Sequence, residues 1–196
     1  RYLPNENLID GVWCTSELAK ELGFRDGDKI IGCESGVITR FSDVIEQIII
    51  SEKISVSREG DVVDLIMPKN VIDKFLNAEN KAILYPRIPT IIGGFSENSL
   101  AKSSGLLVGD KIVGVNGVGV KYYDVFKKEI KKHEDTLVVL DVLRGGVAKT
   151  IEARVDSNSL LGFQAVIFNL SELESLGYYD MASFKYSFFG SFYPGY

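Results

Sequence analysis

Residues 98–117, NSLAKSSGLLVGDKIVGVNG, decide the fold. The stretch reads as a short helix of small residues that ends at Gly105, followed by a Gly-Asp turn at residues 109–110. An alternating strand over residues 111–115 comes next and ends in the hairpin dipeptide Asn-Gly at residues 116–117. So many turn signals in so short a stretch predict a small, tightly folded unit.

The same order of residues occurs earlier, at residues 16–36, as SELAKELGFRDGDKIIGCESG. Of the eighteen positions from residue 16 to residue 33, nine are identical to the residue 82 positions later. Average composition gives roughly one or two such matches by chance. The identical positions are Leu18, Ala19, Lys20, Gly23, Gly27, Asp28, Lys29, Ile30 and Gly32. We interpret this as an internal duplication and predict two small domains, over residues 1–88 and 89–172, followed by an aromatic tail over residues 173–196.

Composition sets limits on the class of protein. The chain has 196 residues, 45% hydrophobic and 25% charged, which is typical of a globular protein. A net charge of −5 without any basic cluster argues against a nucleic-acid partner. No run of about 18 apolar residues is present, so no transmembrane helix is predicted. The chain starts at Arg1 without a signal peptide, and we expect it to be a fragment of a longer protein.

Residues that could carry catalysis are scarce. His133 lies in a lysine-rich stretch where a surface position is predicted, and one histidine cannot build an HExxH zinc site. No CxxC pair, GxSxG elbow or P-loop occurs. Asp26 and Asp28 are interpreted as turn formers. We therefore predict no catalytic residue, no metal site and no cofactor in this fragment.

The two cysteines, Cys14 and Cys33, occur only in the first copy of the repeat, where the second has Ser96 and Val115. We predict that both cysteines are reduced and pack as small hydrophobic side chains. A disulfide between neighbouring strands in an oxidising compartment is the alternative.

Periodicity predicts the same plan of elements in both copies. Helices are expected from residue 16 and over 38–50, 70–77, 99–104 and 122–132, and strands over 8–14, 29–33, 53–56, 61–67, 90–94, 111–115, 137–144, 148–155 and 164–169. In each copy one helix is amphipathic, with Val44 and Ile48 or Val125 and Phe126 on its apolar face.

The pattern SxLAKxxGLxxGDKIxxVNG, followed by an amphipathic helix and a hairpin, resembles the core signature of the PDZ domain. The resemblance covers residues 8–90 and 90–170. It implies a mixed α+β fold of two PDZ-like, partly open β-barrels, each with a short helix and a groove-forming helix. Domains of this family bind extended peptides, often C-termini, by adding a strand to a sheet edge.

The stretch Leu-Leu-Gly-Phe at residues 160–163 resembles the loop that receives the peptide carboxylate in PDZ domains. It follows the signature instead of preceding it, so the domains resemble the circularly permuted bacterial type. This match implies the following peptide-binding residues: Leu161, Gly162, Phe163, Gln164, Val166, Val125 and Phe126 in the second domain, and Leu84, Tyr85, Val44 and Ile48 in the first. Pro86 and Pro89 remove two N–H donors from the first domain and argue against strand addition there. An ordinary buried strand start is the alternative interpretation of residues 160–163.

Tandem permuted PDZ domains resemble the periplasmic insert of site-2-type intramembrane zinc metalloproteases, the regulator of sigma-E protease (RseP) group. The proline-containing joint at residues 85–89 and the aromatic segment at residues 184–190 are similar to that group. The resemblance implies a non-catalytic module on the periplasmic face of the inner membrane, with the zinc in membrane helices of the parent protein. The module would gate access, as a size filter or a sensor of peptide C-termini, for a trimmed substrate such as an anti-sigma factor in a stress response.

Three alternatives stay open at this stage. The pair of domains is also similar to the C-terminal half of HtrA-type serine proteases, and a free peptide-binding adaptor has the same features. The domains could equally be spacers that bind no peptide.

Two interpretations of the aromatic tail are also open. It could lie at the membrane surface, where aromatic side chains gather at the interface, or it could cover the core of the second domain.

Overall fold

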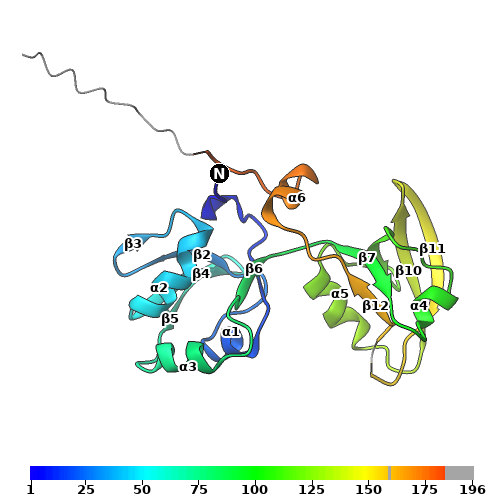
Figure 1. Cartoon of the computed structure of the whole chain (residues 1–196), viewed down its shortest axis with the longest axis horizontal. Coiled ribbons are helices and arrows are strands. Elements are labelled where there is room, and N and C mark those ends of the chain that lie inside the picture. Colours follow the sequence, from blue (N-terminus) through cyan, green and yellow to red (C-terminus); the bar gives the residue numbers. More distant parts are fainter. Residues whose placement is uncertain (159, 184–196) are drawn as a thin grey trace, which may run out of the picture.

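The computed structural model describes residues 1–158 and 160–183, which form two units joined by a short linker (Figure 1). The first unit contains 3-10 helices at Asn5–Asn7 and Phe41–Asp43, strands β1 (Val12–Cys14), β2 (Lys29–Cys33), β3 (Gly36–Val37), β4 (Lys53–Arg58), β5 (Asp61–Ile66) and β6 (Leu84–Pro86), and helices α1 (Glu17–Glu21), α2 (Val44–Ile50) and α3 (Val71–Asn77). The second contains β7 (Thr90–Phe95), β8 (Lys111–Val115), β9 (Val118–Gly119), β10 (Leu137–Arg144), β11 (Val147–Arg154) and β12 (Phe163–Ala165), with α4 (Leu100–Ser103) and α5 (Tyr123–Ile130); α6 (Leu170–Ser175) follows.

The strands form open antiparallel sheets. The first unit has a four-stranded sheet in the order β3-β2-β4-β5 and a separate pair, β1-β6. In the second unit the order is β11-β10-β8-β7-β12, with β9 paired to β8. β7 is longer than β1 and pairs with both β8 and β12, so the strands of the second unit form one sheet. In the first unit the strands form two separate sheets. The predicted mixture of helices and partly open sheets is confirmed, whereas the circular permutation stays a prediction.

The two copies of the repeat share one hydrogen-bond network around an aspartate. The Nε and Nη2 groups of Arg58 donate to the two carboxylate oxygens of Asp28, both at 2.8 Å. Arg144 donates to Asp110 in the same way, both bonds being 2.7 Å long. In each copy the arginine also donates to the carbonyl of the glycine that ends the short helix, Gly23 in one and Gly105 in the other. The aspartates predicted only as turn formers therefore also tie the turn to a distant strand.

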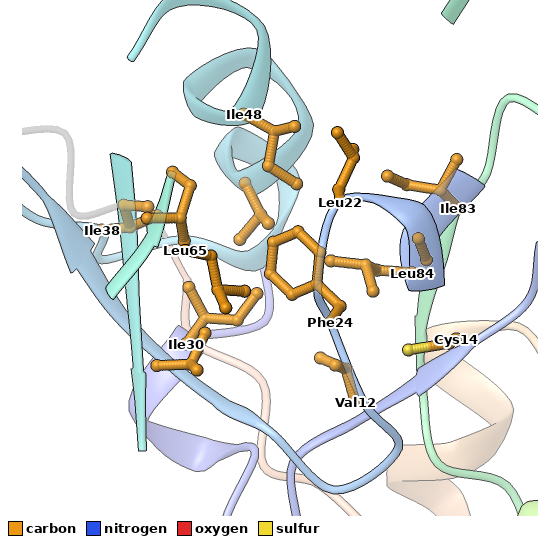
Figure 2. Packing of buried hydrophobic residues seen from close by; sticks show 14 of the residues in the cluster. Val12, Cys14, Leu22, Phe24, Ile30, Ile38, Ile48, Leu65, Ile83 and Leu84 are labelled. Carbon is orange, nitrogen blue, oxygen red and sulfur yellow. The ribbon is translucent and has the colours of Figure 1, made fainter. Parts of the chain in front are cut away.

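Each unit has its own hydrophobic core. In the first, Phe24 lies at the centre, between α2 and the β1-β6 pair, and the packing includes Ile48 and Ile83 (Figure 2). The second core contains Leu106, Ile112 and Leu140, all fully buried. This agrees with the prediction of a core for each copy, although the exact domain boundaries stay a prediction.

Several predicted elements begin or end elsewhere. The helix expected over residues 38–50 is a 3-10 turn followed by α2, which starts only at Val44. The strand expected over 8–14 is reduced to β1, because a 3-10 helix and a turn occupy the preceding residues. The strand expected over 164–169 ends at Ala165, after a bulge in its pairing with β7.

The chain returns to the first unit after β12, which the sequence did not predict. Leu173 of α6 is fully buried in the first unit's core, and Tyr179 after it is buried there too. Tyr2 and Ala182 form an isolated antiparallel bridge by exchanging backbone hydrogen bonds. Tyr178 and Tyr179 of the predicted aromatic tail thus pack against the first unit's core, and the Tyr178 ring also lies 6.3 Å from that of Tyr122 in the second unit. The other aromatic residues of the tail, from Phe184 onward, lie outside the described residues.

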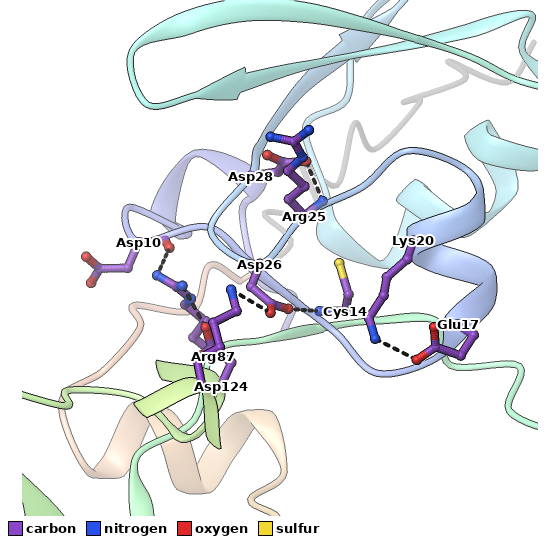
Figure 3. Close-up of polar contacts among 10 residues, drawn as sticks. Asp10, Cys14, Glu17, Lys20, Arg25, Asp26, Asp28, Arg87 and Asp124 are labelled. Carbon is purple, nitrogen blue, oxygen red and sulfur yellow. Dashed lines mark hydrogen bonds and ion pairs between the residues drawn. The ribbon is translucent and has the colours of Figure 1, made fainter. Parts of the chain in front are cut away.

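The joint between the units is held by Arg87, which follows β6. Its Nη2 group donates to Oδ2 of Asp124 on α5 at 2.6 Å, and its Nη1 group donates to the carbonyl of Asp10 at 3.2 Å (Figure 3). Burial raises the pKa of Asp124 although Arg87 lies beside it. The backbone N–H of Tyr123 donates to the carbonyl of Ile88 at 2.8 Å. The start of α5 is therefore fixed to the linker and to the first unit.

Cys14 and Cys33 are both free. Cys14 is buried, and this burial raises the pKa of its thiol to about 12. Among residues 1–158 and 160–183, no group of His, Cys, Asp and Glu side chains is placed to hold a metal ion. In this part of the chain, no helix has the length and apolar character needed to cross a membrane.

The shared aspartate–arginine network yields a first prediction. Asp110→Asn should lower the free energy of unfolding at pH 7 by roughly 2 kcal/mol, because a charge-assisted pair is lost. Arg144 holds the pKa of Asp110 below its usual range, so this stabilisation is present above about pH 4 and disappears as the pH falls through the folded-state pKa. Urea unfolding at pH 7 and at pH 3 measures both effects.

The control for this prediction is Glu152→Gln, which changes an exposed carboxylate on β11. It should leave the stability unchanged at both pH values. Equal stability of Asp110→Asn and the unsubstituted protein at pH 7 would contradict the prediction.

Candidate functional site

The second unit contains an apolar groove between α5 and β12. Its volume is 280 Å³. It is lined by Ser96, Tyr123, Phe126, Lys127, Ile130, Lys131, Asn158, Leu160, Leu161, Gly162, Phe163 and Gln164. Helix α5, the loop before β12 and the strand itself thus enclose one elongated space.

One face of α5 forms the helical wall of the groove. Tyr123, Phe126, Lys127, Ile130 and Lys131 line it, and their spacing of three and four residues places them on the same side of the helix. The ring centroids of Phe126 and Phe163 are 5.6 Å apart, so an aromatic contact joins the helix to the strand across the groove. This contact gives the groove an apolar floor.

The loop before β12 is held in place by its carbonyl groups. The Leu161 carbonyl accepts from the backbone N–H of Ala101 at 2.8 Å, and the Gly162 carbonyl accepts from the N–H of Ser96 at 3.0 Å. Gly162 has a φ of +76°, a conformation that favours glycine. In a trans peptide the C=O and the following N–H point in opposite directions. The N–H groups of Gly162 and Phe163 therefore point away from β7 and α4.

Among the residues that the structure describes, no strand pairs with the outer edge of β12. β12 is the last strand of its sheet, and Phe163 stands opposite Phe95 of β7. Because the flanking Gly162 carbonyl bonds to Ser96, Phe163 and Phe95 form a non-hydrogen-bonded pair, and the N–H and C=O of Phe163 face outward. Outward-facing backbone groups beside an apolar groove are what an added peptide strand needs.

The structure brings most of the predicted second-unit residues together. Leu161, Gly162, Phe163, Gln164 and Phe126 all line the groove. The other two predicted residues, Val125 and Val166, do not line the groove. Val125 packs half-buried against the second core, and the N–H of Val166 donates to the carbonyl of Ile91 on β7.

The predicted residues of the first unit are placed differently. Val44 is 1%, Ile48 0% and Leu84 4% exposed, and all three belong to the first core, where Figure 2 shows Ile48 and Leu84. Tyr85 is half-buried, and its hydroxyl donates to the carbonyl of Phe168 at 2.6 Å. These side chains are buried in the core or hydrogen-bonded to the C-terminal segment that returns to the first unit, so they expose little surface to a ligand.

Sequence reasoning missed several groove residues. Tyr123, Lys127, Ile130 and Lys131 were not predicted. Counting three or four residues along the helix from Phe126 reaches Tyr123 and Ile130, and two further steps of four lead from Tyr123 to Lys127 and Lys131. Ser96 had no such signal, because its role depends on the pairing of β7 with β12.

No known family model matches the chain. Two solved structures are similar to part of it. One is the PDZ domain of an SdrC-like protein from Listeria innocua, with 17% identity and a TM-score of 0.36 over 42% of this chain and 98% of that one. The other is the PDZ domain of an SdrC-like protein from Listeria monocytogenes, with 15% identity and a TM-score of 0.35 over 43% of this chain and 90% of that one.

The loop geometry yields a second prediction. A Cβ added to Gly162 would lie 2.9 Å from Ser96 Oγ and 3.0 Å from Ser99 Cα, so Gly162→Ala combines a steric clash with an unfavourable φ. Gly117 has nearly the same φ, +78°, but nothing lies within 4 Å of the added carbon. Gly117→Ala should therefore cost about 1 kcal/mol of unfolding free energy, and Gly162→Ala roughly 1 kcal/mol more. Thermal unfolding of both variants measures the difference, and equal losses would contradict the prediction.

Proposed function

We propose that the second unit is a peptide-binding module that receives the C-terminal end of an extended peptide. The peptide adds a strand to the outer edge of β12, and its terminal carboxylate accepts hydrogen bonds from the N–H groups of the loop at Gly162. The observation that carries the proposal is the outward-facing backbone of Phe163 next to the apolar groove. An apolar terminal side chain fits the space lined by Phe126 and Ile130.

Binding of a free C-terminus can be followed at the backbone. Peptides with an apolar terminal residue and a free carboxylate should shift the amide resonances of residues 161–165 at submillimolar to millimolar concentration. The same peptides with an amidated end should shift them much less, because the charged acceptor is lost. NMR titration of the 196-residue chain measures both. Residues 83–86 of the first unit act as the internal control and should not shift. No shift at residues 161–165 with either peptide would sink the proposal.

We further propose the setting that the sequence resemblance implies, a non-catalytic periplasmic module of an RseP-type intramembrane zinc metalloprotease. In this setting the zinc belongs to membrane helices of the parent protein and not to this fragment. The module admits a membrane substrate, such as an anti-sigma factor, after an earlier protease has trimmed it. The joint at Arg87 supports gating, because it holds the groove helix against the first unit.

The gating proposal predicts a change in substrate selection when the joint is loosened. Pro86→Gly together with Pro89→Gly should let the full-length protease cut an untrimmed substrate, because the linker loses its restricted backbone. Cleavage of trimmed and untrimmed substrate is compared in cells or in reconstituted membranes. Pro68→Gly, the same change outside the joint, should keep the discrimination. Unchanged discrimination in the joint variant would count against gating by the joint.

A further inference from the structure

Two lysines stand on the helical wall of the groove. Lys127 and Lys131 line the groove and are exposed. Their neighbours on the helix are paired: Lys128 with Asp26 at 3.1 Å and Lys132 with Glu129 at 2.6 Å. Within residues 1–158 and 160–183, no ion pair includes Lys127 or Lys131. A chain with a net charge of −5 thus keeps two uncompensated positive charges at its peptide groove.

The positive charge continues beyond the groove. Lys127 and Lys131 also line a second hollow of 160 Å³ on the side of α5 that faces the first unit, together with Lys20 and Trp13. The acidic side chains of this hollow already have partners, because Asp124 pairs with Arg87 and Asp26 with Lys128. Lys20 is paired with Glu17 at 2.6 Å and Lys128 with Asp26, so Lys127 and Lys131 are the lysines of this hollow that belong to no ion pair among the described residues.

The spacing of the two lysines suits an extended peptide. Residues four apart on a helix are separated by about 6 Å along the axis, and alternate side chains of a strand by about 6.6 Å. In a strand added to β12, alternate side chains point toward α5. Two carboxylates at alternate positions of the peptide can therefore meet Lys131 and Lys127 at once. The Lys127 Nζ lies 5.7 Å from the centre of the Tyr123 ring, which keeps this lysine on the groove face.

We infer that the groove selects acidic peptides, in which carboxylate side chains near the C-terminus pair with Lys127 and Lys131. The inference rests on the proposed peptide-binding function and adds the chemical class of the ligand. The apolar floor holds the terminal side chain, and the two lysines distinguish acidic ligands from neutral ones of the same length.

The test compares two fluorescent peptides that differ only in charge. Both have a free C-terminus and an apolar last residue, and Glu residues at alternate positions in one are Gln in the other. The acidic peptide should bind the intact chain about tenfold more tightly at low salt, and the difference should shrink as salt is added. Lys127→Gln and Lys131→Gln should each weaken acidic binding about two- to fivefold and leave the neutral peptide unaffected. Fluorescence polarisation measures all of these affinities.

The matched control is Lys149→Gln, which neutralises an exposed lysine on β11, outside the groove lining. It should change neither affinity. Equal binding of the two peptides would overturn the charge selection and leave the peptide-binding function standing. If Lys149→Gln weakens binding of the acidic peptide as much as Lys127→Gln and Lys131→Gln do, the charge selection by the groove is also overturned, since overall charge would then explain the effect. If neither peptide binds, the proposed function fails and this inference fails with it.

Discussion

The arrangement of the two units depends on the Arg87 guanidinium. This one side chain contacts the Asp10 carbonyl in the first unit and the Asp124 carboxylate in the second, and its backbone carbonyl accepts a hydrogen bond from Tyr179 of the returning segment. Asp124 is almost fully buried, so its charge would be costly without Arg87. Tyr122 adds to the joint, because its hydroxyl donates to Asp10 and its ring lies 5.4 Å from the Arg87 guanidinium. A proline-flanked linker is thereby held in one conformation.

Duplication explains the scaffold but not the difference in surface between the copies. The turn–strand network built on Asp28 is repeated at Asp110, because it depends on residues that both copies retain. After the second hairpin the copies diverge. The first unit inserts α3, whose Val71 and Phe75 are buried in the first core, and it is then covered by α6. The second unit has neither addition, and its groove stays open.

Much of the fold could be predicted because its signals are local. Residues 111–115 and 137–144 were predicted as strands with the observed limits, since alternation and the flanking turns define both. The loop at Gly162 was predicted from the resemblance of Leu-Leu-Gly-Phe at residues 160–163 to the carboxylate loop of PDZ domains, and its role stays a prediction. That Val44 and Ile48 belong to the closed first core and not to a peptide groove, and that Tyr2 pairs with Ala182, could not be found this way. They depend on contacts between segments far apart in the sequence, which periodicity does not report.

The groove and the joint share one helix, α5. The first residue of α5, Tyr123, is bonded to the linker at Ile88, its ring makes an edge contact with Trp13 of the first unit, and it also lines the groove. The opposite wall, β12, is paired with β7, which begins directly after the linker. Both walls of the groove are therefore attached to the chain at the linker, α5 through Ile88 and β12 through the start of β7.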